Sequence, residues 1–342
     1  MKKKSSLKDI AKLVGVSTSL VSYVLNNKEK ENRVSLVTAA KIRKAAKELN
    51  YHPNLNARSL KTNKTRSIGV ILADISNPFF ANLARAIEDV AFHQDYTVIF
   101  GSSDENIEKF EKVMDFMLTK QVDGFIIAPP EGSVKSIEKL ANRNFPMVLI
   151  DRYFLSIDAN SVVIDNFKAS FQATNYLIDQ GCRRIGTLLN TSQLNHYKDR
   201  FDGYIHALKS ANILVDNSII MAIDPKLLLV NIEQAIKELA RQNVDALYFH
   251  NNTLAAEGLK QLLAYNRDFY KNIKVVVFDQ NAGFDFLESF IPYIKQPIEK
   301  MASKALTILI NQINNYEMKK MNLFLEPKLI TSSFEQDMLS SE

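Results

Sequence analysis

The sequence predicts an α/β protein, in which a small all-α helix-turn-helix domain precedes a larger body of doubly wound parallel sheets. Three observations support this fold class. A basic N-terminal segment has the apolar spacing of three short helices, and the rest of the chain alternates short apolar runs with longer amphipathic stretches. That alternation occurs twice, which indicates two lobes with a cleft between them. We therefore expect a helical domain over residues 1–52, a hinge segment over 53–66 and a two-lobed domain over 67–335.

Charge divides the chain in the same place. Residues 1–66 contain 16 of the 43 Lys and Arg residues but only four of the 38 acidic ones, so this part carries a net charge of +12 and the remainder −7. A small basic domain on a larger acidic body is typical of a module that binds a polyanion such as nucleic acid. A Lys-rich terminus that merely aids solubility is the alternative, and the helical patterning of the segment argues against it.

The first two helices of the basic segment have clear boundaries. Apolar residues at 7, 10, 11 and 14 form one stripe of a short helix, and Gly15 supplies the left-handed residue that commonly ends a helix. Ser17 is a natural N-cap for a second helix that buries Val21 and Val24. Ser35 caps a third helix, whose inner face includes Ile42. A helix, a turn with glycine and a second helix are the parts of a helix-turn-helix, which places its second helix in the DNA major groove.

The exposed face of the second helix carries short hydroxyl side chains. Such side chains let a backbone approach DNA closely, and their hydroxyls can donate to phosphates or base edges. An ordinary amphipathic helix with a polar face is the alternative interpretation of the same pattern. With the two valines turned inward, the exposed set is Thr18, Ser19, Ser22 and Tyr23.

The segment "HPNLNARSLKTNKTRS" links the helical domain to the body. Pro53 disfavours a helical conformation for the residue before it and so ends the third helix. Asn54 can cap a short further helix that extends to Leu60, an apolar residue among basic ones. A flexible linker is the alternative, and it is the one that we expect in the absence of DNA.

The body reads as alternating strands and helices. Fully apolar strands separated by helices indicate parallel sheets that are covered on both faces. A helix at 297–314 and a last strand, "PKLITSSF", follow the two α/β sets. The expected strands are "SIGVILA", "YTVIF", "GFIIAP", "PMVLID", "SVVID", "RIGTLL", "VDALYFH" and "IKVVVFD", and the expected helices are 78–94, 106–120, 133–143, 166–180, 197–211, 227–241 and 252–265.

Polar side chains follow several of these strands. Ligands of open α/β sheets bind beyond the carboxyl ends of the strands, where this chain places Asp74, Asp151, Asn251 and Asp279. Carboxylates and amides bind several hydroxyl groups at once, and aromatic rings stack on the apolar faces of sugars or bases. The rings of Phe79 and Phe80 lie at a helix start beside the first strand. For Asp74 and Asp165, an N-cap of the following helix is an equally open alternative.

The stretch "LKDIAKLVGVSTSLVSYVLN" resembles the helix-turn-helix of the lactose-repressor (LacI) family of bacterial transcription regulators. The likeness continues through "LNYHPNLNARSLKTNKTRSIGVILADISNPFF" and covers residues 7–334, so it implies a body like a type I periplasmic binding protein. It implies a homodimeric regulator, in most cases a repressor, that binds a palindromic double-stranded DNA operator. Sugars and their derivatives are the family's most frequent effectors, although purines also occur.

The resemblance assigns further residues. "DRFDGY" looks like the family's signature beside the effector, which adds Arg200 to the expected effector site. In the hinge, the paired leucines of a dimer wedge into the minor groove in such proteins, a role that falls on Leu60. The remaining positions that the resemblance places on DNA are Ser17, Asn26, Asn54 and Ala57.

Two departures from the family pattern concern the operator. Tyr23 stands where relatives commonly carry an arginine, and tyrosine cannot copy the bidentate pairing of arginine with guanine. The loop "NNKEKENRVS" is also about two residues longer than usual. Both leave DNA binding as the expectation but make the operator sequence unpredictable.

The sequence favours a binding protein over an enzyme. It lacks GxGxxG, GxxxxGK[ST] and G-x-S-x-G motifs, and the five histidines have no metal spacing, so we expect no cofactor and no metal. Cys182 has no evident base and is interpreted as a packing residue. No stretch approaches the ~18 apolar residues of a membrane span, so we expect a cytoplasmic protein without a membrane partner. The competing hypothesis is a cytoplasmic sugar-binding or sugar-processing protein with an incidental basic N-terminus, in which Asp151 and Asp165 form a glycosidase pair.

Overall fold

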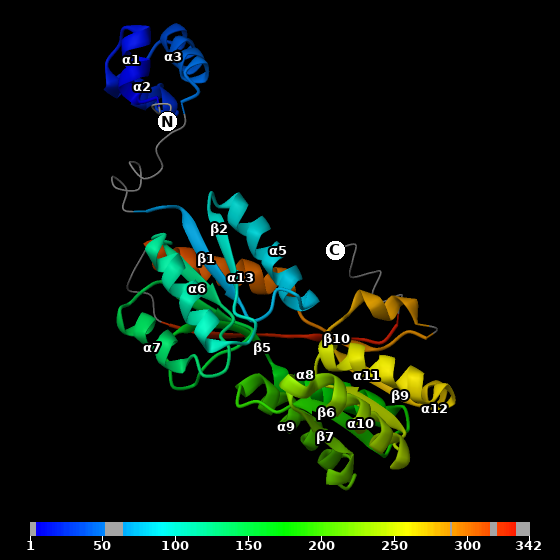
Figure 1. The fold of residues 1–342 in the computed structure, drawn as a ribbon. Helices are drawn as coiled ribbons and strands as arrows, with labels where there is room; N and C mark the ends of the chain where they lie inside the picture. The colour runs from blue at the N-terminus through cyan, green and yellow to red at the C-terminus, as the bar shows by residue number, and fades with distance from the viewer. Residues whose placement is uncertain (1–4, 52–63, 288, 315–319, 333–342) are drawn as a thin grey trace. The chain divides into compact units, whose positions relative to one another are not determined.

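The computed structural model describes residues 5–51, 64–287, 289–314 and 320–332. The chain divides into two compact units, Met1–Thr65 and Arg66–Glu342 (Figure 1). The first unit is called the head below and the second the body. No helix in the described ranges is both long enough and apolar enough to cross a membrane.

The head is a three-helix unit built as the sequence predicts. Gly15 ends the first helix in the left-handed conformation, with φ of +76°, and the Ser17 and Ser35 hydroxyls accept hydrogen bonds from backbone amides of the helices that follow. One cluster of buried side chains, which includes Ile10, Val21 and Ile42, holds the helices together. They are α1 (Leu7–Val14), α2 (Thr18–Leu25) and α3 (Leu36–Glu48).

The first lobe of the body is a six-stranded sheet with strand order β11-β5-β4-β3-β1-β2. Helices α5 (Pro78–His93) and α13 (Ile298–Asn314) pack on one face, and α6 (Ile107–Thr119) and α7 (Val134–Asn142) cover the other. Successive residues of a strand point to opposite faces, and because both faces are covered the central strands β3 and β4 are apolar and buried along their whole length. The strands are β1 (Ser67–Leu72), β2 (Thr97–Ser102), β3 (Gly124–Ile127), β4 (Met147–Ile150), β5 (Asn160–Ile164) and β11 (Asn322–Leu325).

The second lobe repeats this plan with strand order β12-β10-β9-β8-β6-β7. Helices α8 (Asn166–Asp179) and α9 (Asn195–Ser210) cover one face, and α10 (Leu228–Arg241) and α11 (Asn252–Tyr265) the other. A short helix, α12 (Arg267–Asn272), follows α11. The strands are β6 (Ile185–Asn190), β7 (Ile220–Ile223), β8 (Ala246–Phe249), β9 (Lys274–Phe278), β10 (Tyr293–Lys295) and β12 (Lys328–Ile330).

Two expectations about the body need correction. Among the described strands all neighbours pair in parallel except the last, because β12 runs antiparallel to β10. The lobes are also not simply successive, since α13 and β11 return to the first lobe before β12 joins the second. The apolar stripe of α13 explains the return, because it packs against α5 and against strands β3, β4 and β5 of the first lobe. The chain therefore crosses between the lobes three times: after β5, after β10 and between β11 and β12.

Candidate functional sites

The exposed face of α2 carries the hydroxyl side chains that the sequence places there. Thr18, Ser19 and Tyr23 are exposed, whereas Val21 and Val24 are fully buried. Ser17 is exposed too, but its hydroxyl accepts a hydrogen bond from the Leu20 amide at 3.2 Å and thereby caps the helix.

Ser22 differs from the expectation because it is half-buried. The side-chain amide of Asn26 donates to the Ser22 carbonyl at 2.7 Å and to its hydroxyl at 3.3 Å, which ends α2 with a local contact. The hinge positions Asn54, Ala57 and Leu60 lie outside the described residues.

In the body, the two lobes present an aspartate at equivalent positions. Asp151 follows β4 and Asp279 follows β9, the third strand of each sheet order. Both residues have left-handed backbone conformations, with φ of +66° and +71°. Both backbone amides donate to the neighbouring strand at 3.1 Å, Asp151 to Val162 and Asp279 to Ile294. The two residues are 5% and 8% exposed, so each lobe buries one carboxylate at the carboxyl end of its sheet.

Arg200 of α9 connects these carboxylates. Its Nε donates to the Asn166 side chain at 2.8 Å, its Nη1 donates to the His250 carbonyl at 2.7 Å, and the guanidinium lies 3.4 Å from the ring centroid of Phe278. Burial raises the pKa of both aspartates, and the Arg200 charge opposes this rise in each. Asp151, Arg200 and Asp279 therefore belong to one electrostatic cluster between the lobes.

Asp279 keeps an unusually high proton affinity in this cluster. Burial raises its pKa to about 6, although the Arg200 charge and a 2.8 Å hydrogen bond from the Gln296 amide both oppose the rise. The nearby Asp151 charge adds to the increase. Gln296 lies at the second crossover, where the chain passes from β10 to α13.

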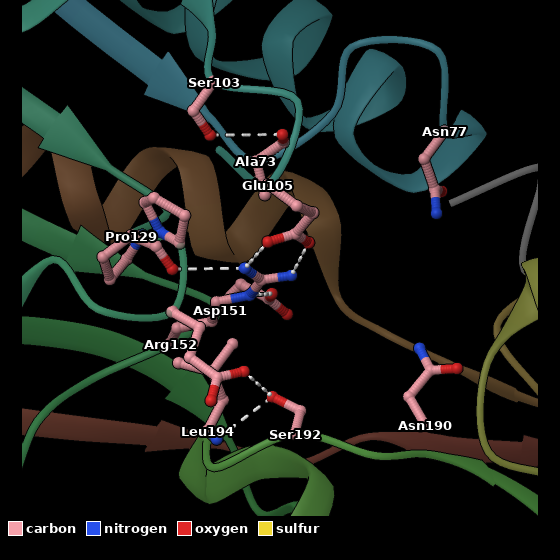
Figure 2. Close-up of polar contacts among 12 residues, drawn as sticks. Ala73, Asn77, Ser103, Glu105, Pro129, Asp151, Arg152, Asn190, Ser192 and Leu194 are labelled. Atoms are coloured by element: carbon pink, nitrogen blue, oxygen red, sulfur yellow. Dashed lines mark hydrogen bonds and ion pairs between the residues drawn. The ribbon is translucent and has the colours of Figure 1, made fainter. Parts of the chain in front are cut away.

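Arg152, the residue after Asp151 at the end of β4, forms a second charged group. Its side chain is 3% exposed and its two terminal nitrogens donate to the Glu105 carboxylate at 2.8 and 2.5 Å (Figure 2). One of them also donates to the Pro129 carbonyl at 3.1 Å. Burial alone would lower the pKa of Arg152, but Glu105 reverses this and raises it. Glu105 was not predicted, because it lies in a turn after β2 that no motif marks.

The Arg152–Glu105 ion pair of the first lobe lies close to α9 of the second lobe. The Arg152 charge acts on the buried His196 and the half-buried Tyr197. The pKa of His196 is far below its usual value, because burial and the two neighbouring arginines all disfavour the charged ring. His250 at the end of β8 is affected in the same way, and its pKa falls to about 3. Both histidines are therefore neutral at physiological pH.

Among the described residues, hydrogen bonds at three places join the two lobes. The side-chain amides of Asn77 and Asn252 exchange hydrogen bonds of 3.1 and 3.0 Å. The Glu131 carboxylate accepts from the Ser192 hydroxyl at 2.9 Å and from the backbone amide of Gln193 at 3.3 Å. The third set is a long contact of 3.4 Å, in which the Asn195 amide donates to the Tyr153 carbonyl.

Unpaired polar atoms lie around the same space. The Asn190 oxygen, the His196 Nδ1 and the Gln296 oxygen are buried and find no hydrogen-bond partner among the described residues. In Figure 2 the side chains of Asn77 and Asn190 approach the gap from opposite lobes, with the Arg152–Glu105 pair beside it. An unmade hydrogen bond of a buried polar group costs about 1–3 kcal/mol. These atoms are thus positioned to bind hydroxyl or amide groups of a ligand.

The other predicted residues have mixed placements. Asp74 is half-buried and accepts from the Ser76 amide and hydroxyl, so it stabilises the turn before α5 but is not its N-cap, a role that belongs to Asn77. Asn251 caps α11 through a 2.8 Å bond from the Leu254 amide, and Asp165 caps α8.

Phe79 and Phe80 at the start of α5 are both buried, and their ring centroids lie 5.0 Å apart in an edge-to-face arrangement. The Arg152 guanidinium carbon lies 5.6 Å from the Phe80 ring centroid. Phe79 lines a cavity of about 460 Å³ between α5 and the ends of β9 and β10, which Asp279 and Gln296 also line.

Sequence comparison matches both units to one family. Residues 6–54 match the family described as bacterial regulatory proteins of the lacI family, and residues 65–322 match the periplasmic binding proteins and sugar binding domain of the LacI family. The transcriptional regulator RegA of Clostridium saccharobutylicum is 32% identical over 95% of this chain and 98% of its own. The ribose operon repressor of Halalkalibacterium halodurans is 31% identical over 95% and 96%.

Structure comparison agrees about the fold. The lac repressor dimer bound to operator and the anti-inducer ONPF superposes with a TM-score of 0.82 over 96% of this chain and 98% of its own, at 20% identity. The helix-turn-helix head, the two-lobed body and the relatives at more than 30% identity lead to one assignment. This chain belongs to the LacI family of DNA-binding transcriptional regulators.

Proposed function

We propose that the protein is a repressor that binds a palindromic operator as a homodimer. Its affinity for the operator decreases or increases when a small hydroxylated effector, most simply a sugar, binds to the body. In this proposal residues 1–52 read DNA, 53–66 form the hinge, and 67–335 bind the effector and dimerise. It acts in the cytoplasm, where the DNA lies. The observation that carries the proposal is the coupling of Asp151, Arg200 and Asp279 from two lobes in one buried cluster, on a chain that also has a folded basic head.

The recognition helix supports the DNA half of the proposal. Thr18, Ser19 and Tyr23 are exposed on α2 and carry no bulky charged group, so the helix backbone can approach base edges and phosphates closely. Asn26 and Ser17 lie at its two ends, and Ser22 faces Asn26. Asn54, Ala57 and Leu60 complete the proposed DNA contacts in the hinge.

The cleft supports the effector half. Carboxylates at Asp151 and Asp279 accept from ligand hydroxyls, Arg200 donates, and Phe79 offers an aromatic face. The names of two matches point the same way, because one describes a sugar binding domain and the other a ribose operon repressor. Asn251 and Asp74 contribute through the helix start and the turn that they stabilise.

Effector binding acts through lobe closure. A ligand that contacts both lobes binds the closed arrangement better, and it shifts the equilibrium by that difference in affinity. The inter-lobe contacts of Asn77, Asn252 and Glu131 are the ones that a change of lobe angle must alter. The proposed hinge directly precedes β1 in the chain. A movement of the first lobe therefore also moves the attachment point of the head.

Dimerisation makes the operator site specific. One head reads only a half-site, and two heads on a palindrome add their contacts. Exposed aromatic side chains on the first lobe support a partner surface there: Phe92 on α5, Phe100 on β2 and Phe116 on α6.

The test compares full-length protein with a truncated chain that starts at Ser67, on DNA from upstream of the protein's own gene. We expect that only the full-length protein shifts this DNA in preference to scrambled competitor, and that its affinity falls steeply with salt because phosphate contacts release counterions. Identical behaviour of the two chains would favour the alternative, a sugar-binding protein with an incidental basic terminus.

A further inference from the structure

The cleft has more carboxylates than cations. Arg152 and Arg200 are the buried cations of the described residues, and both nearby histidines are neutral. The carboxylates that accompany them there are Glu105, Glu131, Asp151 and Asp279.

Arg152 already holds an anion. Its terminal nitrogens donate to both oxygens of Glu105, a bidentate pairing that is the same geometry by which arginine binds a phosphate or carboxylate ligand. The Pro129 carbonyl accepts a second hydrogen bond from Nη1 of Arg152, and Nε lies 3.5 Å from the Asp151 carboxylate. The face of Arg152 that recognises anions is therefore occupied by the protein's own side chain.

Arg200 is engaged in a different way. Neutral acceptors, the Asn166 side chain and the His250 carbonyl, take its Nε and Nη1 donors, and its planar face rests on Phe278. These contacts fix the guanidinium within the second lobe. Its charge is shared between Asp151 and Asp279, the two carboxylates that it stabilises.

We propose that Glu105 makes the cleft selective for uncharged, hydroxyl-rich effectors, because it occupies the anion-binding face of Arg152 and so excludes phosphorylated and carboxylated analogues. The proposal rests on the proposed function of the cleft as the effector site.

Electrostatics explains the exclusion. A phosphate group that enters the cleft must either displace Glu105, which is 47% exposed on its side chain, or stay beside carboxylates while Arg152 and Arg200 keep the acceptors that they have. Like charges in contact repel more strongly near a protein surface than in bulk water, because the effective dielectric constant there is lower. Uncharged hydroxyls avoid this repulsion and can pair with the Asn190 oxygen and the His196 Nδ1. A site that rejects one ligand class by repulsion gains specificity without added affinity for the other.

The adjoining cavity beside α5 is also lined by more carboxylates than cations. Its cations are Arg85 and Lys295, and its carboxylates are Asp89, Asp279 and Glu299. Arg85 is already paired with Asp89 at 3.1 Å. An anionic substituent that extends from the cleft along α5 thus meets further negative charge.

The first test uses inorganic phosphate as the probe. Thermal unfolding of the full-length protein is followed against phosphate concentration, with chloride at equal ionic strength as the reference. Wild type is expected to show no specific stabilisation, whereas Glu105→Gln and Glu105→Ser free the Arg152 guanidinium and bind phosphate at least tenfold more tightly. Glu108→Gln removes an exposed charge in the first turn of α6 and serves as the matched control, which should behave like wild type.

The second test uses matched ligand pairs on the same proteins. Ribose and ribose 5-phosphate, glucose and glucose 6-phosphate, and uridine and its 5′-monophosphate are compared by thermal shift. In each pair that binds wild type, the uncharged member should bind more tightly, and Glu105→Gln should reduce that preference at least tenfold. Circular dichroism of the unliganded variants establishes that they are folded.

The outcomes separate the two proposals. Tighter binding of a phosphorylated member to wild type, or no gain of phosphate affinity in either Glu105 variant, would overturn the role of Glu105. A gain of phosphate affinity in these variants supports that role whether or not the protein binds DNA. Absence of sequence-specific DNA binding by the full-length wild type, in contrast, contradicts only the proposed function.

Discussion

The two lobes of the body share one scaffold but differ in how they treat the same carboxylate. Asp151 and Asp279 follow equivalent strands and adopt the same left-handed backbone. In the first lobe the next residue is Arg152, which Glu105 locks in place. In the second lobe the aspartate is held by a neutral amide, from Gln296. Repeated architecture therefore fixes where a polar group stands, and the neighbours that differ decide its charge and its chemistry.

Loss of the cation that the lobes share should have the largest effect. Arg200→Met leaves Asp151 and Asp279 buried without their common countercharge, so we expect a loss of about 3 kcal/mol of unfolding free energy in the body and loss of the effector response. Urea denaturation of the full-length protein measures the first, and thermal shift with the panel of uncharged ligands the second.

A surface arginine provides the control for this change. Arg184 is 44% exposed on its side chain and pairs with Asp216 at 3.1 Å, and Arg184→Met should cost less than about 1 kcal/mol. Equal losses for both substitutions would show that the position between the lobes confers no special importance on Arg200.

The protonation of Asp279 distinguishes the second lobe by its pH dependence. Its pKa rises from an ordinary 3.8 to about 6 on folding. The folded state therefore binds this proton more tightly than the unfolded state, and the contribution of Asp279 to the unfolding free energy is greatest below pH 4. That contribution is lost as pH rises through 6. Asp279→Asn removes the titration, and we expect the stability of this variant relative to wild type to increase between pH 4.5 and 7.5 by about 2 kcal/mol. Urea denaturation at several pH values measures the difference, and a constant difference across this range would contradict the raised pKa of Asp279.

The amide pair between the lobes should have a smaller effect. Asn77→Ser keeps a residue that can cap α5 but removes the amide that pairs with Asn252. With Asn252→Ala and the double variant it completes a thermodynamic cycle, for which we expect a coupling energy of about 1 kcal/mol. Coupling close to zero would mean that the lobes do not rely on this contact.

The smallest effect concerns the head. Tyr23→Phe removes one exposed hydroxyl from α2 and leaves its buried face intact. We expect DNA affinity to fall by less than tenfold if the hydroxyl binds a phosphate, with a nearly equal loss on all sequences. Fluorescence anisotropy on selected and scrambled duplexes measures this, and a loss confined to the selected duplex would instead assign the hydroxyl to a base edge.

Much of the fold could be predicted because its signals are local. The serine caps, Gly15 and the apolar runs mark where helices and strands begin and end, and most predicted boundaries lie within two residues of those observed. The strands β7, β10 and β11 were missed because they are short, and β7 and β11 lie at sheet edges with partly exposed faces. The antiparallel pairing of β12 depends on which lobe the chain enters last, and no local pattern records that.

From the residue pattern alone, site residues could be predicted only where they directly follow a predicted strand. Asp151 and Asp279 stand directly after apolar runs, and Arg200 was found by family resemblance. Glu105, Asn190 and Gln296 were missed because their roles arise from partners far away in the sequence. Asn77 left a usable signal, since an asparagine before proline is a typical start of a helix.

The most direct test of the account is selection of genomic DNA fragments by the full-length protein, with and without an uncharged ligand that stabilises it. We predict enrichment of fragments that share a two-fold symmetric sequence, and a change of that enrichment by the ligand in wild type but not in Arg200→Met. Absence of any enriched sequence, or a ligand effect that persists unchanged in Arg200→Met, would contradict the control of DNA binding by the cleft.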